Sequence, residues 1–258
     1  MSSPSVPASA PAPDRASARH VEPAAAIALS YQVVLRQLTS RSRIIGLTLL
    51  ALVAPISGFA LGSADASLDD SVRLIASVGL GLVLPVVSLV FAGAAVGDLR
   101  EDKTLVYLWL RPMDRWPIVV GAALAAATLV APITIIPIVA AAILTGAGNG
   151  IVGGTLLATI VGLVAYIGVF TLFGVWLKRF IVWGLAYILI WEGFIAQAGA
   201  GVARIALRKY TRSILVERTG ADLDLADFSL VTAVIVPLVV AGVALAVASW
   251  RLSNQDID

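Results

Sequence analysis

The sequence contains no cysteine and only one histidine, and charged residues make up 13% of its 258 positions. Without cysteine the chain has no disulfide framework and no thiolate metal or redox centre. A soluble domain carries about 25% charged residues, because its surface must face water. This chain is instead 59% hydrophobic, with a mean hydropathy of +0.96. We therefore expect an all-α protein most of whose surface faces lipid.

Several functional signatures are also missing. No G-x-x-x-x-G-K-[ST] loop occurs, so we expect no nucleotide site on this chain. The G-x-G-x-x-G match at 148–153 lacks a preceding strand and reads as a turn. A net charge of +2 is too small to indicate nucleic-acid binding. With His20 in a polar tail, we expect no catalytic site, cofactor or metal on this chain.

Uncharged runs define the predicted membrane spans. A helix needs about 20 mainly apolar residues to cross the hydrocarbon core, and its backbone must be bonded internally. The uncharged run 116–177 is too long for one span and is divided by glycines within 146–154. The domain 44–258 is thus predicted to hold six transmembrane helices, at 44–64, 74–97, the two parts of 116–177, 180–203 and 228–250.

Orientation follows from lysine and arginine in the short loops. The N-terminal side, the loop after the second span and the turn after the fourth are all basic. The loop after the first span is mainly acidic, and the glycine turn is uncharged. Both termini are therefore predicted to be cytoplasmic. The loop 202–227 opposes this orientation, because it is predicted to be external and yet carries five basic residues: Arg204, Arg208, Lys209, Arg212 and Arg218.

The N-terminal part is predicted to contain two segments. Residues 1–23 are rich in proline, alanine and serine, which predicts a disordered cytoplasmic tail. Residues 24–43 place Ile27, Tyr31, Val34 and Leu38 on one helical face. This pattern predicts an amphipathic helix lying at the cytoplasmic membrane surface before the first span.

The connection after the second span carries the clearest functional pattern. Asp98 and Glu101 have the spacing of a capping box, and Pro112 follows Arg111, which predicts a short helix over 98–110. Its remaining turns are apolar and aromatic. We interpret this helix as a lever held by a soluble partner, with an interfacial anchor as the alternative. A third interpretation, a metal-dependent membrane phosphotransferase using Asp98, Glu101 and Asp102, lacks the glycine and arginine context of such enzymes.

The segment 97–121 resembles the signature of ABC-2 type permeases, with a departure at Gly121-Ala122, where a basic residue is common. The similarity extends in span order over most of residues 30–250, and a weaker patch lies at 177–210. The matching positions are Asp98, Thr104, Tyr107, Leu108, Arg111, Pro112 and Arg115.

The resemblance implies a bacterial cytoplasmic-membrane permease subunit that exports its substrate. Two such subunits, identical or paralogous, would lie side by side in the lipid bilayer, each bound to a cytoplasmic ATPase that carries ATP and Mg. Helix 98–110 would be the coupling helix. The residues implied at the ATPase interface are Asp98, Arg100, Glu101, Thr104, Tyr107, Leu108, Arg111 and Arg115.

Polar residues around the fifth predicted span form a second candidate site. A carboxylate within a span is expensive and usually faces a cavity or a partner group. Glu192, with Gln197 nearby, is therefore either a gate or pathway residue or a partner in a packing hydrogen bond. Arg204, Arg208 and Arg212 recur every four residues, which predicts an external amphipathic helix over the pore mouth or a headgroup anchor. The main alternative to a permease is a membrane assembly subunit with no transport path.

Overall fold

The computed structural model describes residues 22–101, 115–148, 150–193, 206–221 and 228–254. Within these ranges every regular element is a helix, and no strand occurs. Five helices are long and apolar enough to cross a membrane: Arg41–Ser63, Leu68–Asp98, Trp116–Leu144, Ile151–Trp176 and Leu230–Ser253. The architecture of the chain is therefore that of a multi-pass membrane protein.

These helices correspond to five of the six predicted spans. Helices α2 (Arg41–Ala51) and α3 (Val53–Ser63) together form the first, and α8 (Trp116–Leu144), α9 (Ile151–Trp176) and α13 (Leu230–Ser253) each form one. The turn predicted between α8 and α9 is confirmed, because Gly146, Gly148 and Gly150 all have positive φ. Glycine adopts that backbone conformation without steric cost.

The second span is longer than predicted at both ends. It runs through five consecutive elements: α4 (Leu68–Leu74), η1 (Ile75–Val83), α5 (Leu84–Ser88), η2 (Leu89–Gly93) and α6 (Ala94–Glu101), of which η1 and η2 are π-helical. Ser67 caps the first turn by accepting a hydrogen bond from the Asp70 backbone N–H. Acidic side chains stabilise a helix N-terminus, so the charges that we took as the boundary belong to the helix.

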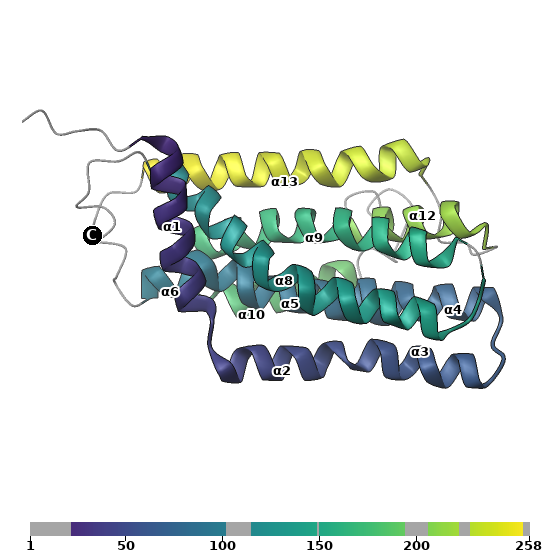
Figure 1. The fold of residues 1–258 in the computed structure, drawn as a ribbon. Helices are drawn as coiled ribbons and strands as arrows, with labels where there is room; N and C mark the ends of the chain where they lie inside the picture. Colours follow the sequence, from purple (N-terminus) through teal and green to yellow (C-terminus); the bar gives the residue numbers. More distant parts are fainter. Residues whose placement is uncertain (1–21, 102–114, 149, 194–205, 222–227, 255–258) are drawn as a thin grey trace, which may run out of the picture.

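The long helices run between two ends of an elongated bundle (Figure 1). At one end, which we call the Asp98 end, α6 and α13 finish and α2 and α8 begin. At the opposite end, which we call the Gly150 end, α3 and α8 finish and α9 and α13 begin.

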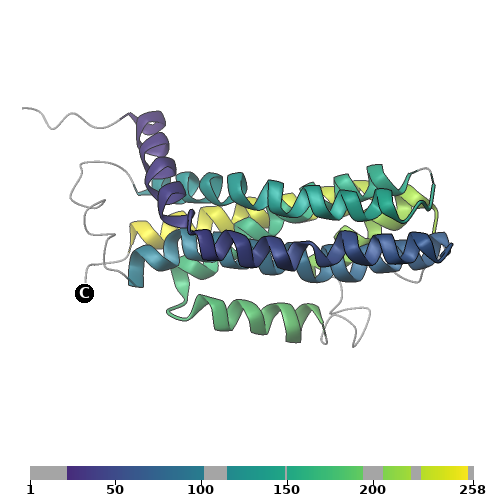
Figure 2. The same ribbon diagram turned by 60° about the horizontal axis from the view of Figure 1, so that its bottom comes forward.

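Helix α1 (Pro23–Leu38) lies across the bundle at the Asp98 end (Figures 1 and 2). It buries Ala26, Ser30, Val34 and Leu38. Gly121 of α8 permits the contact, because a Cβ there would lie 2.8 Å from the Ile27 carbonyl oxygen. The predicted helix 24–43 is therefore too long, since α1 ends at Leu38 and residues from Arg41 onwards belong to α2.

Helix α9 is the centre of the bundle. It contacts α8, α13, α12 (Leu207–Thr219) and the second span. Its Tyr166 and Phe170 side chains are fully buried and stack with ring centroids 5.7 Å apart. Small residues allow the close approach of α13, since a Cβ on Gly168 would lie 2.8 Å from the Cα of Ala241.

The fifth predicted span, 180–203, is not found as one long helix in the described residues. Helix α10 (Phe180–Ala186) continues into the π-helix η3 (Tyr187–Glu192), and the combined helix is shorter than the other candidate spans. It starts at the Asp98 end, where the Phe180 ring packs on Gly93 and Gly97. Helix α12 follows it along the bundle and finishes at the Gly150 end (Figures 1 and 2). Six spans are therefore not confirmed.

Candidate functional site

Asp98 lies inside a helix rather than at its start. Helix α6 begins at Ala94 and continues the second span, so the predicted capping box of Asp98 and Glu101 is wrong. The Asp98 carboxylate instead accepts a hydrogen bond of 3.0 Å from the Arg43 guanidinium at the start of the first span. This ion pair joins two candidate spans at the Asp98 end of the bundle.

Arg115 fixes the other end of the same connection. It immediately precedes α8, and its Nη1 donates to the carbonyl oxygens of Leu252 and Ser253, each at 3.1 Å. These carbonyls belong to the last turn of α13, where a helix has unsatisfied acceptors and a partial negative charge. Arg115 therefore ties the start of the third predicted span to the end of the last one.

Only some of the other residues of the predicted ATPase interface belong to the described residues. Arg100 and Glu101 lie in the last turn of α6. Residues 102–114 lie outside the described residues, and with them most of helix 98–110, including Thr104, Tyr107, Leu108 and Arg111. The structure thus defines the two attachments of this segment, at Asp98 and Arg115, and how they connect to the bundle.

Glu192 is buried and caps α12. Its Oε1 accepts hydrogen bonds from the Tyr187 hydroxyl at 2.8 Å and the Leu207 N–H at 3.1 Å, and its Oε2 accepts from the Arg208 N–H at 2.9 Å. The N-cap residue of α12, Ala206, has no side-chain acceptor. The free N–H groups in the first turn of α12 are therefore bonded by Glu192, which is remote from them in the sequence. A packing hydrogen bond, one of the two predicted roles of Glu192, is therefore present, and one of its donors is the backbone N–H of Arg208.

Tyr187 is a member of this cluster that sequence analysis missed. It lies five residues before Glu192, and in an α-helix such residues are not neighbours on one face. The π-helical winding of η3 brings them together. The Tyr187 ring also packs edge-on against Phe170 and Phe173 of α9, with centroids 6.1 and 5.8 Å away. No sequence signal marks a π-helical turn, so this pairing required the structure.

Helix α12, which contains two of the three arginines of the predicted external helix, is largely buried against other helices. Gln197 and Arg204 lie outside the described residues, and α12 starts at Leu207. Helix α12 packs on α9, α13 and η1, and Tyr210, Ile214 and Leu215 are buried. Arg208 reaches into the bundle, where its guanidinium lies against Gly81 of the second span. Helix α12 therefore buries most of its surface against other helices. Its predicted position over a pore mouth stays a prediction.

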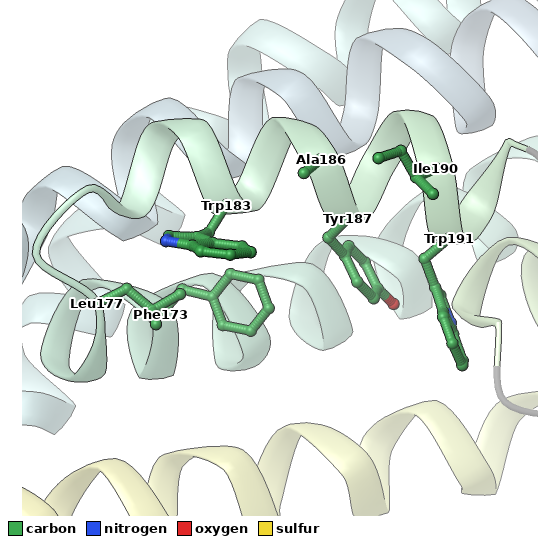
Figure 3. A pocket seen from close by; sticks show the side chains of 7 residues that line it. All are labelled: Phe173, Leu177, Trp183, Ala186, Tyr187, Ile190 and Trp191. Atoms are coloured by element: carbon green, nitrogen blue, oxygen red, sulfur yellow. The ribbon is translucent and has the colours of Figure 1, made fainter.

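An apolar cleft of about 410 Å³ lies between α9 and the α10–η3 helix. Figure 3 shows the Trp183 ring facing Phe173, while the Tyr187 and Trp191 rings extend from η3 on the same side. The outer face of this helix is also apolar and exposed at Val182, Leu189 and Ile190. The cleft is lined by Phe173, Leu177, Trp183, Ala186, Tyr187, Ile190 and Trp191. Its chemistry suits an apolar occupant.

Among the described residues no group of three or more histidine, aspartate or glutamate side chains is arranged to hold a metal ion. No protein-family model matches the sequence, and no curated protein is significantly similar to it.

Proposed function

We propose that the chain is the membrane-spanning permease subunit of an ABC transporter, which exports a substrate using ATP hydrolysed by a separate cytoplasmic ATPase. The observation that carries this proposal is the anchoring of segment 102–114. Arg43–Asp98 links one side of it to the first and second spans, and Arg115 links the other side to α8 and α13. A push on this segment would be transmitted to four candidate spans at once.

The proposed topology has six passages with both termini in the cytoplasm. The α10–η3 helix and α12 would together make the fifth passage, each covering part of the depth of the membrane. Non-helical backbone is tolerated within the membrane where protein surrounds it. In support, the two helices follow one another along the bundle, and Glu192 at the end of one caps the start of the other.

A second permease subunit, identical or paralogous, is the proposed partner within the membrane. The exposed apolar face of the α10–η3 helix and the adjacent cleft support an apolar neighbour at this position. The proposed localisation is the bacterial cytoplasmic membrane.

The experiment is co-purification of the full-length chain, carrying an affinity tag, with its host's ATPases. We expect a P-loop ATPase to bind stably and its ATP hydrolysis to be stimulated. Tyr107→Ala and Arg111→Ala should abolish that stimulation while the chain stays folded. Arg179→Gln serves as the matched control, since Arg179 is exposed in a different loop at the same end of the bundle.

Two outcomes would contradict the proposal. If no ATPase binds in lipid nanodiscs or in detergent, the chain is not a permease subunit of this class. If an ATPase binds but both variants stimulate it as the wild type does, segment 102–114 is not the coupling element. Binding without stimulation of hydrolysis would favour the alternative, an assembly subunit.

A further inference from the structure

Two arginines of α12 lie inside the helix bundle. Arg208 and Arg212 are four residues apart on the same helical face, and both are half-buried. The Arg208 guanidinium occupies space that Gly81 leaves open, because a Cβ on Gly81 would lie 2.6 Å from Nη2. Gly81 belongs to η1, near the middle of the candidate span Leu68–Asp98. A guanidinium at this depth is costly unless it meets an anion or water.

The neighbouring carboxylate does not neutralise this pair. Glu192 interacts electrostatically with both arginines, but its two oxygens accept hydrogen bonds from Tyr187 and from the backbone N–H groups of Leu207 and Arg208. Two guanidinium groups and one carboxylate leave the described cluster with an excess positive charge. Arginine stays protonated in proteins, so neutralisation by deprotonation is not available.

Two buried guanidinium donors in this cluster have no hydrogen-bond partner within the described ranges. They are the Nε of Arg208 and the Nε of Arg212. The Tyr166 hydroxyl, fully buried in the middle of α9, lies beside the Glu192 carboxylate and close to Arg208. Buried polar groups normally have partners, so two orphan guanidinium donors beside an excess positive charge indicate a missing acceptor.

We propose that Arg208, Arg212 and Tyr166 form an anion-binding site within the bundle that takes an oxyanion, either the phosphate of a lipid headgroup or a free phosphate. A guanidinium presents a planar fork of donors that matches the oxygens of phosphate. The Tyr166 hydroxyl adds a neutral polar group to the wall of the site. The site is independent of the proposed function, because it is formed by this chain alone and requires no ATPase.

The first test uses inorganic phosphate as the probe. The full-length chain is purified in an uncharged detergent, and thermal unfolding is followed by tryptophan fluorescence in phosphate or chloride at equal ionic strength. A ligand that binds the native state raises Tm. We expect millimolar phosphate, or a lipid phosphate, to raise Tm by about 2–4 °C, which corresponds to about 1 kcal/mol for a protein of this size.

The second test identifies the source of the phosphate. The chain is reconstituted in nanodiscs of phosphatidylcholine alone or with added phosphatidylglycerol, and retained lipid is measured by native mass spectrometry. Preferential retention of phosphatidylglycerol assigns the site to a lipid headgroup, and stabilisation by free phosphate assigns it to a soluble ion. Either result supports the site.

Three variants make the proposal falsifiable. Arg208→Gln with Arg212→Gln should abolish both effects, whereas Arg218→Gln, an exposed position on the same helix, should preserve them. If the glutamine variant does not fold, Arg208→Lys with Arg212→Lys keeps both charges but loses the planar fork, and should weaken binding about 10-fold. Wild-type binding in the folded glutamine or lysine variant would overturn the proposal, as would the absence of any effect in the wild type.

Discussion

Arg43 and Asp98 lie 55 positions apart in the sequence, and in the structure the Arg43 Nη2 donates to the Asp98 Oδ2 at 3.0 Å. Their side chains are 27% and 24% exposed, so the pair is partly shielded from water. It joins the first turn of α2 to the last turns of α6, shortly before residue 102.

Arg43→Gln and Asp98→Asn should each lower the free energy of unfolding, and the double-mutant cycle should give a coupling energy of about 1 kcal/mol. The energy is small because partly exposed ion pairs are screened by water and salt. Chemical unfolding in detergent micelles measures it. A coupling energy of zero would mean that the pair does not connect the two helices.

Glu192→Ala should destabilise the protein by about 1–3 kcal/mol, because it leaves one buried and one partly buried N–H group of α12 without an acceptor. Glu192→Gln retains one carbonyl oxygen and should cost less. Thermal unfolding ranks the variants by stability. The control is Glu217→Gln, since Glu217 is an exposed residue of α12. Equal stability of Glu192→Ala and wild type would contradict the capping role.

Arg115→Gln should loosen the last turn of α13, because the bonds to the Leu252 and Ser253 carbonyl oxygens are lost. We expect faster amide hydrogen exchange at the end of α13 and a loss of about 1 kcal/mol in stability. Arg179→Gln, an exposed arginine at the same end of the bundle, should leave the exchange rates unchanged. Unchanged exchange in Arg115→Gln would show that the arginine does not hold this helix end.

Gly168→Ala should destabilise the bundle by about 1–3 kcal/mol, since its Cβ would lie 2.8 Å from the backbone of Ala241 on α13. Gly153→Ala in the same helix has no atom within 4 Å of the new Cβ and should be neutral or stabilising. Thermal unfolding compares the two. If both variants behave alike, α9 and α13 are not in close contact.

Cysteine labelling tests the proposed orientation, because the chain contains no native cysteine. Ser42→Cys and Asn254→Cys, exposed at the Asp98 end, should react with an impermeant maleimide only after the membrane is opened. Ala64→Cys and Ser229→Cys, exposed at the Gly150 end, should react in intact cells. The reverse pattern would place the segment 102–114 outside the cytoplasm and remove its proposed contact with an ATPase.

Five of the six predicted spans could be located from sequence because the length of an uncharged run is a local property. The error at the second span was also local, since charged residues such as Asp70 can occupy the end turns of a membrane helix. The prediction of a capping box at Asp98 was wrong because α6 begins before Asp98 and continues through it. Of the candidate site, sequence analysis identified Glu192 and Arg208 as unusual but missed Tyr187 and Tyr166.

The sequence by itself determined that this is a helical, lipid-facing chain, because hydrophobicity along the backbone fixes where a helix can meet hydrocarbon. Only the tertiary structure decided which partners the polar side chains of this chain contact. A charged side chain in a bundle goes wherever a partner from another helix satisfies it, and that partner is set by packing rather than by sequence spacing. Glu192 therefore caps a helix that begins 15 residues later, and Arg208 enters the space left by Gly81.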